Sequence, residues 1–179
     1  MAAPQRRIKK NERIYEIGNG RYLEASKSGD MMIIYDKQFP EKKIEFPMYR
    51  WATFVHTIDD IDKQVQILKD MKSVFYMCHI GGGYYVSVAN GFFCVDLRKF
   101  YLNKDLDEIR ASRSGIALKL KEWDSLKEAI TKLHQVFPHL LSQVPCSQQS
   151  DHANHIAAME CTECYPFGPV AFKQEEEVN

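Results

Sequence analysis

Hydrophobic and polar residues alternate in two separate stretches of the chain, and in both the pattern changes to helical spacing at a tryptophan. Lys43–Trp51 (KIEFPMYRW) aligns with Gly115–Trp123 (GIALKLKEW) without a gap, and apolar residues occupy every second position in each. This period of two is typical of a half-buried strand. After each Trp the apolar residues recur every three or four positions, which predicts a helix packed on one face. The chain therefore contains an internal repeat in which a strand leads into a helix.

The repeat extends upstream of both tryptophans. Tyr22–Ala25 matches Tyr85–Val88, and Ile33–Phe39 matches Cys94–Phe100, with a first hairpin that is two residues longer on this alignment. Before its last strand the second copy carries an insertion of about eleven residues, roughly Leu102–Ser112, rich in Asp, Glu and Lys. Insertions of this kind are typical of exposed loops. We therefore expect the second copy to differ from the first mainly by a longer loop.

Each copy predicts several strands followed by one helix. The helices are expected from about Pro47 to Lys72 and from about Lys121 to Val136, and Pro138 ends the second. A single unit of about 60 residues is marginal as an isolated fold, so the two units are expected to pack together. The chain then divides into a basic arm (residues 1–13), a first repeat (14–80), a second repeat (81–138) and an acidic tail that contains Cys and His (139–179).

Charge is distributed unevenly although the chain as a whole is neutral. The 24 Lys and Arg residues balance the 24 Asp and Glu residues, but the arm is basic and the tail acidic. The chain has no apolar run long enough for a membrane-spanning helix and no secretory signal. It contains five cysteines, an odd number. These features predict an intracellular protein in a reducing compartment, with no membrane partner.

The second copy carries a further pattern over Tyr84–Ile130. A Tyr-x-Val-x-Val strand, a hairpin, a Val-Asp-Leu-Arg segment with aromatic residues after it, a Gly-Ile-x-Leu strand and a Trp that opens the helix follow one another. In order and spacing they resemble the C-terminal domain of the transcriptional coactivator positive cofactor four. The resemblance covers about 50 of the 179 residues, and the first copy resembles the family only through its likeness to the second. The residues that carry it are Tyr85, Val86, Val88, Val95, Asp96, Leu97, Arg98, Phe100, Tyr101, Gly115, Ile116, Leu118 and Trp123.

The resemblance implies an α+β fold in which a curved antiparallel sheet of about four strands is followed by one helix and pairs as a two-fold dimer. Two tandem copies then imply an intramolecular pseudo-dimer in which the divergent first copy replaces the second subunit, and further oligomerisation stays open. The family binds single-stranded DNA or melted duplex and connects activators with the transcription machinery. The chain is thus expected to be a nuclear, DNA-binding transcription coactivator.

The strand alternation gives a candidate binding surface. If the apolar positions of the last strand face the helix, Lys119 and Lys121 face away from it, with Arg113 on the same side, and Tyr85 and Arg98 also point outward. Cations contact phosphates and aromatic rings stack on bases with little sequence preference. The alternative interpretations are an ordinary amphipathic sheet and a core Trp. The candidate contacts are Tyr85, Arg98, Arg113, Lys119, Lys121 and Trp123.

Other positions on the same surface differ in charge and polarity between the copies. Glu24 and Glu45 stand in the first copy where the second has Ser87 and Ala117, so we expect the first copy to bind nucleic acid more weakly. In the second copy the alternation places Phe92 outside and Phe93 inside.

The tail contains a second constellation with a chemical meaning. His152, His155, Cys161 and Cys164 follow the spacing H-x2-H-x5-C-x2-C, and Cys146 could replace one His. Zinc prefers such nitrogen and sulfur ligands in a tetrahedron. The alternative is a tail in which the Cys and His residues are scattered and bind no metal. Zinc in the tail is therefore a hypothesis, and the sequence requires no other cofactor.

Catalytic motifs are not apparent in the sequence. Gly81-Gly82-Gly83 lacks the Lys-Ser/Thr of a phosphate-binding loop and is interpreted as a turn before a strand. We therefore predict a protein that is not an enzyme and that binds single-stranded DNA. Two alternatives stay open: an assembly module that kept the fold and binds other proteins, and an RNA-binding variant, because base stacking serves both nucleic acids.

Overall fold

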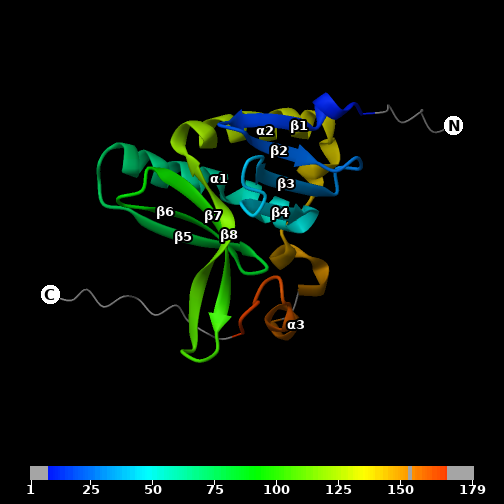
Figure 1. The fold of residues 1–179 in the computed structure, drawn as a ribbon. Coiled ribbons are helices and arrows are strands. Elements are labelled where there is room, and N and C mark those ends of the chain that lie inside the picture. The colour runs from blue at the N-terminus through cyan, green and yellow to red at the C-terminus, as the bar shows by residue number, and fades with distance from the viewer. Residues whose placement is uncertain (1–7, 153–154, 169–179) are drawn as a thin grey trace.

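The computed structural model describes residues 8–152 and 155–168, and it contains two antiparallel four-stranded sheets, each followed by a helix (Figure 1). This confirms the α+β class and agrees with two tandem units. The first unit consists of β1 (Ile14–Gly18), β2 (Arg21–Ala25), β3 (Met31–Asp36), β4 (Lys43–Pro47) and α1 (Met48–Lys69), and a short 3-10 turn, η1 (Lys10–Glu12), precedes it. The second unit consists of β5 (Phe75–Gly81), β6 (Tyr84–Ala89), β7 (Cys94–Asn103), β8 (Glu108–Lys119) and α2 (Leu120–Val136).

Strand pairing has the same register in both units, which corrects the sequence alignment of the first hairpin. Tyr22 lies opposite Tyr35 in the first sheet, and Tyr85 lies opposite Arg98 in the second. Both pairs are thirteen positions apart, so the prediction of a first hairpin two residues longer was wrong. A shift of two residues keeps every side chain on its own face of a strand, so hydrophobic alternation alone does not detect it.

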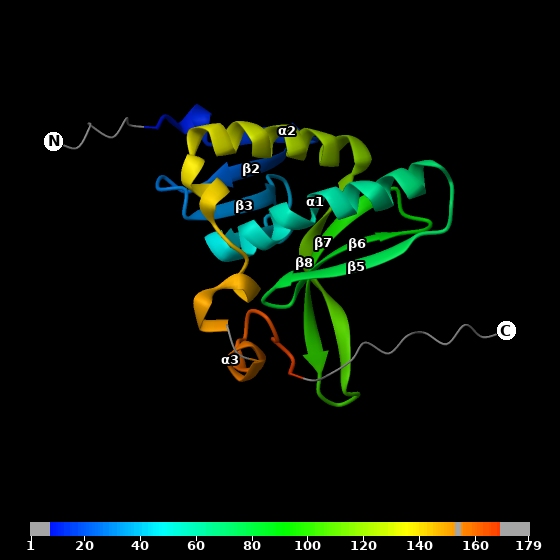
Figure 2. The same ribbon diagram turned by 180° about the vertical axis from the view of Figure 1, so that it is seen from behind.

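The insertion in the second unit extends two strands instead of forming a loop. Leu97 pairs with Ile116 across nineteen positions, whereas Ile34 pairs with Ile44 across ten, so nine residues are added. Strand pairing continues through the added residues as far as Asn103 and Glu108. We call residues 100–111 the hairpin arm, and it projects from the second sheet in Figures 1 and 2. The expected eleven-residue loop is thus a two-stranded extension, because β-hydrogen bonds satisfy its backbone.

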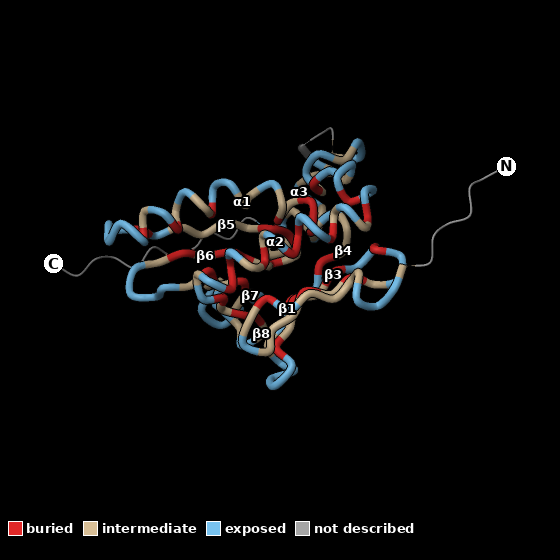
Figure 3. Tube along the Cα trace, turned by 90° about the horizontal axis from the view of Figure 1, so that it is seen from above, coloured by how far each residue is buried: buried red, intermediate tan, exposed pale blue. Residues whose placement is uncertain are grey.

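The two helices cross over between the units. Helix α1 packs on β5 and β6 of the second sheet, and α2 packs on β1 and β2 of the first (Figures 1 and 2). Strands β4 and β8 also contact each other. The buried side chains of both units form one continuous hydrophobic cluster, and the buried positions in Figure 3 lie where helices and sheets face each other. Each sheet is therefore covered in part by the helix of the other unit.

Reciprocal hydrogen bonds join the two helices. The indole nitrogen of Trp51 on α1 donates to Nε2 of His134 on α2 at 3.0 Å, and that of Trp123 on α2 donates to Asp62 on α1 at 2.7 Å. Each acceptor lies eleven residues after the Trp of its own helix, and both indoles are fully buried. Burial lowers the pKa of His134, which favours the neutral imidazole that this hydrogen bond requires. The helices thus make equivalent contacts with each other.

The first turn of each helix also contacts a glycine-containing β-turn of the other unit. Glu122 of α2 accepts hydrogen bonds from Asn19 at 2.7 Å and from Arg21 at 2.7 Å, next to the β1–β2 turn. Arg50 occupies the equivalent position of α1, one residue before Trp51, and lies beside the β5–β6 turn. The sign of the charge at this position is therefore opposite in the two halves of the molecule.

The segment after α2 folds back onto the first unit. It contains three 3-10 turns and a short helix: η2 (Pro138–Ser142), η3 (Cys146–Gln148), η4 (Ser150–His152) and α3 (His155–Glu160). Leu140 is buried, and both η2 and η3 contact α1. The described part of the predicted tail therefore contacts the rest of the protein. Residues 1–7 of the predicted basic arm and residues 169–179 of the tail lie outside the described residues. None of the described helices is long and apolar enough to cross a membrane.

Candidate functional site

Strand register brings two of the predicted contact residues together on the outer face of the second sheet. Tyr85 on β6 lies opposite Arg98 on β7, and Arg98 lies opposite Gly115 on β8. Directly paired residues point to the same side of a sheet, and the adjacent positions Val86 and Leu97 are fully buried beneath the helices. The predicted alternation of the two strands is therefore correct at these positions.

Arg98 is held in place and partly neutralised by its neighbours. Its guanidinium donates to both carboxylate oxygens of Asp96, at 2.9 and 3.1 Å, and to the Ser112 carbonyl at 3.0 Å. The hydrogen bond with Asp96 raises the pKa of Arg98 further. A cation paired in this way attracts a phosphate less strongly than a free one, because the carboxylate already supplies a negative charge.

Tyr85 contributes little open ring surface. Only 8% of the residue is exposed, because its ring packs against His79 at 5.0 Å and Phe100 at 4.8 Å between centroids. Burial raises the pKa of its hydroxyl. Tyr85 thus packs beneath its neighbours on the outer face and exposes little ring for base stacking.

Three exposed cations lie along β8 and at the start of α2. Arg113, Lys119 and Lys121 are all exposed, and none of them forms an ion pair with another described residue. Lys119 lies opposite Cys94 at the end of the sheet. These three residues have the accessible positive charge that the sequence predicted for the surface.

Two exposed aromatic residues lie at the end of the sheet that carries Lys119. Phe92 is 67% exposed and Phe93 is 55% exposed, and both immediately precede β7, which begins at Cys94 opposite Lys119. The prediction that Phe93 points inward was wrong, because the residue lies before the first residue of β7 and strand alternation does not apply to it. The exposure of Phe93 could not be read from the sequence pattern, although Asn90-Gly91 marks a turn just before it.

Trp123 is part of the core. It is fully buried, its ring lies edge-on to Phe54 at 6.1 Å, and its nitrogen donates to Asp62. The core interpretation of this residue, left open by the sequence, is the one that the structure supports. We therefore omit Trp123 from the proposed contact surface.

The equivalent face of the first sheet carries two carboxylates in place of neutral side chains. Glu24 and Glu45 both lie opposite Ile33, in the row that corresponds to Ser87 and Ala117. Glu24 accepts a hydrogen bond from the Tyr35 hydroxyl at 3.2 Å, and Tyr35 stacks on Tyr22. Glu24 pairs with Arg13 at 3.5 Å and Glu45 pairs with Lys43 at 2.8 Å, so these carboxylates neutralise cations that a phosphate backbone would otherwise contact on this sheet.

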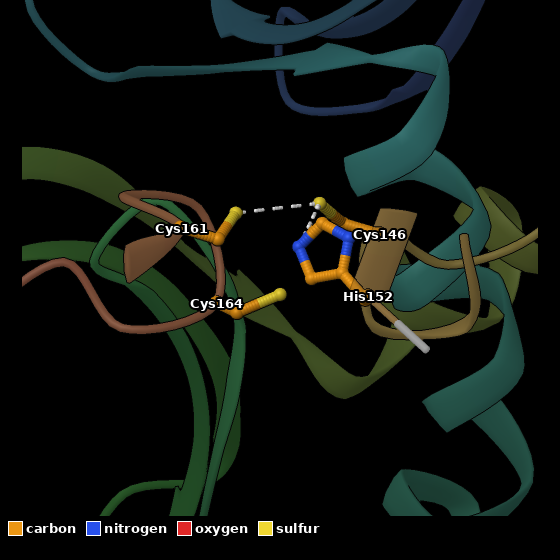
Figure 4. A group of neighbouring side chains, drawn as sticks. All are labelled: Cys146, His152, Cys161 and Cys164. Atoms are coloured by element: carbon orange, nitrogen blue, oxygen red, sulfur yellow. Dashed lines mark hydrogen bonds between the residues drawn. The ribbon is translucent and has the colours of Figure 1, made fainter. Parts of the chain in front are cut away.

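A cluster of Cys and His side chains forms in the C-terminal segment. Cys146 and His152 face Cys161 and Cys164 across a short gap, and the four ligand atoms lie within 4.8 Å of one another (Figure 4). This cluster could bind a metal ion. It contains three of the four predicted ligands together with Cys146, the residue named as a replacement for one His. The side chain of His155 lies outside the described part of the chain.

The chemistry of the cluster favours a thiolate at Cys161. Burial by itself favours the neutral thiol of Cys161, but hydrogen bonds from the Cys164 backbone amide and from His152 outweigh it and lower the pKa to about 7. Burial raises the pKa of Cys146, whose sulfur lies 3.7 Å from that of Cys161. One thiolate is thus easily formed, and the others need an additional positive charge to lose their protons.

Comparison with known proteins gives one match. Residues 85–129 match the family model of the Transcriptional Coactivator p15 (PC4). The second unit is therefore p15 (PC4)-like. The match includes Tyr85, Arg98, Arg113, Lys119 and Lys121, but the first unit and the Cys/His cluster lie outside it. The comparisons with curated proteins and with solved structures gave no match.

Proposed function

We propose that the protein is a nuclear, non-enzymatic transcription coactivator that binds single-stranded DNA or melted duplex through the outer face of the second sheet. The match to p15 (PC4) supports a nucleic-acid-binding, coactivator-like function. The observation that carries the finer proposal is a row of exposed cations along β8 and the start of α2 (Arg113, Lys119 and Lys121), with the exposed rings of Phe92 and Phe93 near its Lys119 end. The transcription machinery is the protein partner that this function implies.

Cations and aromatic rings on this surface are expected to contact different parts of a nucleic acid. Lys and Arg neutralise phosphates and release counterions, which gives binding that weakens with added salt. Exposed rings stack on unpaired bases, at about 1–3 kcal/mol per base, and every base offers such a face. Duplex DNA keeps its bases stacked inside, so the rings favour a single strand over a duplex. The expected binding therefore has little sequence preference.

An assembly module that binds other proteins is the second candidate. It is favoured by the pairing of Glu24 with Arg13 and of Glu45 with Lys43 on the first sheet, and by the pairing of Arg98 with Asp96 on the second. Both features reduce the positive field that a nucleic acid would meet. RNA is the third candidate, because stacking and phosphate contacts do not distinguish it from DNA.

Fluorescence anisotropy with a labelled single strand of about 20 nucleotides, its duplex and the matching RNA tests the proposal across a salt series. We expect the DNA single strand to bind most tightly. The double variant Lys119→Ala/Lys121→Ala should bind about tenfold more weakly, with a log–log salt slope reduced by about 1.4, because two phosphate contacts are lost. Phe92→Ala should weaken binding by roughly fivefold to a hundredfold, according to the stacking that is lost.

The matched control is Lys132→Ala, which removes an exposed lysine from α2. Its affinity and salt slope should equal those of the unmodified chain. No binding at low salt would reject the proposal in favour of the assembly module, and tighter binding of RNA would favour the RNA variant. A salt slope reduced in this single-lysine control by about half as much as in the double variant would show that binding depends on total charge and not on this surface.

We also propose that the two units form an intramolecular pseudo-dimer. The crossed helices and the reciprocal hydrogen bonds of Trp51 and Trp123 support this arrangement, because each unit covers part of the other's sheet. Light scattering at micromolar concentration is expected to give the mass of one chain, 20.8 kDa. An obligate dimer whose helices cross only between chains would contradict it.

A further inference from the structure

We propose that Cys146, His152, Cys161 and Cys164 bind one zinc ion tetrahedrally, and that this ion fixes the C-terminal segment onto the β5–β6 turn of the second unit. The site lies outside the proposed nucleic-acid surface and outside the p15 (PC4) match. Its four ligands leave no open coordination position, so the ion has a structural role.

The distances fit a tetrahedral ion. The sulfur of Cys146 lies 3.7 Å from the sulfur of Cys161 and 3.8 Å from Nε2 of His152. Zinc–sulfur bonds of about 2.3 Å place two sulfur ligands about 3.8 Å apart at the tetrahedral angle. These two separations match edges of a coordination tetrahedron, and all four ligand atoms lie within 4.8 Å of one another. A disulfide between the two sulfurs would need a separation of about 2.05 Å.

The ligand types select the metal. Three thiolates and one imidazole are soft or intermediate donors, and a tetrahedral set of this kind favours zinc over magnesium or calcium, which take oxygen ligands. The turn between Cys161 and Cys164 is closed by the Tyr165 amide, which donates to the Cys161 carbonyl at 2.8 Å. Two ligands three positions apart on a closed turn can reach one ion without rearrangement.

The segment has little else to stabilise its fold. Its apolar residues are largely exposed: Ile156 is 72% exposed, Met159 is 60% exposed and Tyr165 is 49% exposed. Short segments without a core of their own need a metal or disulfides to hold one conformation. Because Cys146 and His152 precede α3 and the other two ligands follow it, an ion between them would tie together both ends of the segment.

The turn that carries two of the ligands also makes the contact with the body of the protein. Glu163, between Cys161 and Cys164, accepts two hydrogen bonds from the Arg50 guanidinium, at 2.8 and 2.7 Å. Its carbonyl accepts a hydrogen bond from the Gly82 amide at 2.8 Å. Both side chains of the ion pair are nearly buried, with 11% and 13% exposed. An ion that fixes this turn therefore also fixes its contact with α1.

The glycine triplet of the β5–β6 turn leaves room for the C-terminal segment to contact this turn. Gly82 and Gly83 have positive φ values of 61° and 81°, which disfavour any other residue. A Cβ atom on Gly82 would lie 2.8 Å from the Glu163 carboxylate, and one on Gly83 would lie 3.0 Å from the Phe167 ring. The triplet, which the sequence marked only as a turn, thus leaves the space that the C-terminal segment fills.

The charge of Arg50 gives an independent reason for the contact. In the first half of the molecule Arg21 supplies the counter-charge to the equivalent residue, Glu122. In the second half the position of Arg21 is taken by Tyr84, whose ring lies 4.6 Å from the Arg50 guanidinium and offers only a cation–π contact. Arg50 therefore obtains its carboxylate from the C-terminal segment, because the sheet provides none there.

Metal analysis of the purified, reduced full-length chain tests the proposal. After removal of metal with a chelator and addition of Zn²⁺, mass spectrometry should find one zinc per chain. Co²⁺ in its place should give the intense visible bands of a tetrahedral thiolate site. Cys146→Ser and Cys164→Ser should each reduce the bound zinc from one per chain to nearly none, whereas Cys78→Ser, which changes a cysteine outside the cluster, should keep it.

His155→Ala decides between the two possible ligand sets. We expect this variant to retain one zinc per chain while His152→Ala loses it, and retention by Cys146→Ser together with loss by His155→Ala would overturn the assignment. Failure of the reduced chain to take up Zn²⁺ would overturn the site altogether, as would a disulfide between Cys146 and Cys161 that persists under cellular reducing conditions.

Hydrogen exchange tests the docking role. Removal of zinc should speed exchange of the Gly82 amide at least tenfold, because its acceptor is the Glu163 carbonyl, while amides in the core of β6 and β7 stay protected. Unchanged exchange at Gly82 in the metal-free chain would show that the contact does not depend on the ion. Neither metal content nor hydrogen exchange involves nucleic acid. A failure of the zinc proposal is therefore distinguishable from a failure of the proposed function.

Discussion

Replacement of Trp123 by alanine is expected to lower the free energy of unfolding by about 3–5 kcal/mol, because a fully buried ring is lost and a cavity is left between the units. The change also removes the hydrogen bond to Asp62, which links α2 to α1. A loss of this size is a large part of the stability of a typical domain. Urea denaturation followed by circular dichroism measures it.

The companion variant Trp123→Phe keeps an aromatic ring but removes the nitrogen donor. This variant should lower the free energy of unfolding by less, about 1–3 kcal/mol, because Asp62 retains its hydrogen bonds from Lys127 at 2.9 and 3.0 Å. If Trp123→Ala costs less than 1 kcal/mol, the ring does not hold the units together. Any loss of DNA binding in Trp123→Ala must be read as unfolding, so binding is better measured in the Phe variant.

Replacement of Glu122 by alanine should lower the free energy of unfolding by about 3 kcal/mol, because it breaks a buried ion pair and leaves Arg21 with a single carboxylate partner. Glu122 also accepts hydrogen bonds from Asn19 and from the Lys119 amide at the start of α2. One side chain thus joins the β1–β2 turn of the first unit to the helix of the second. The same denaturation experiment measures the loss.

The control for this prediction is Glu128→Ala, which removes an exposed carboxylate from the same helix. Surface changes of this kind usually alter stability by less than about 0.5 kcal/mol. Equal losses in the two variants would contradict the buried network. A larger loss in Glu122→Ala would support its role in joining the units.

Local pattern predicted the elements of the fold well. Alternation placed Ile44 and Phe46, and in the second copy Ile116 and Leu118, on the buried face of their strands, and the structure confirms this. The expected helices begin and end within three residues of α1 and α2. These features depend on neighbours in the sequence, so the sequence carries them directly.

The candidate sites were predicted only in part. The exposure of Lys119 follows from strand alternation, whereas Lys121 lies in the first turn of α2. The hydrogen bond of the buried Trp123 could not be predicted, because its partner Asp62 lies 61 residues away in the chain. The spacing of Cys161 and Cys164 marked a metal site, but whether His155 or Cys146 completes it depends on how the segment folds back. Apart from the glycine triplet, nothing in the sequence predicted that Glu163 would contact the β5–β6 turn.

The sequence by itself therefore determined the repeat, the strand-to-helix order of each unit and the exposed cations of the second sheet, because side-chain period and turn chemistry are local. Tertiary structure alone decided that the helices cross between the units, that Arg50 takes its carboxylate from Glu163 and that four ligands converge. The physical reason is distance along the chain: these contacts join residues up to 113 positions apart. Only the packing of the whole chain brings such residues together.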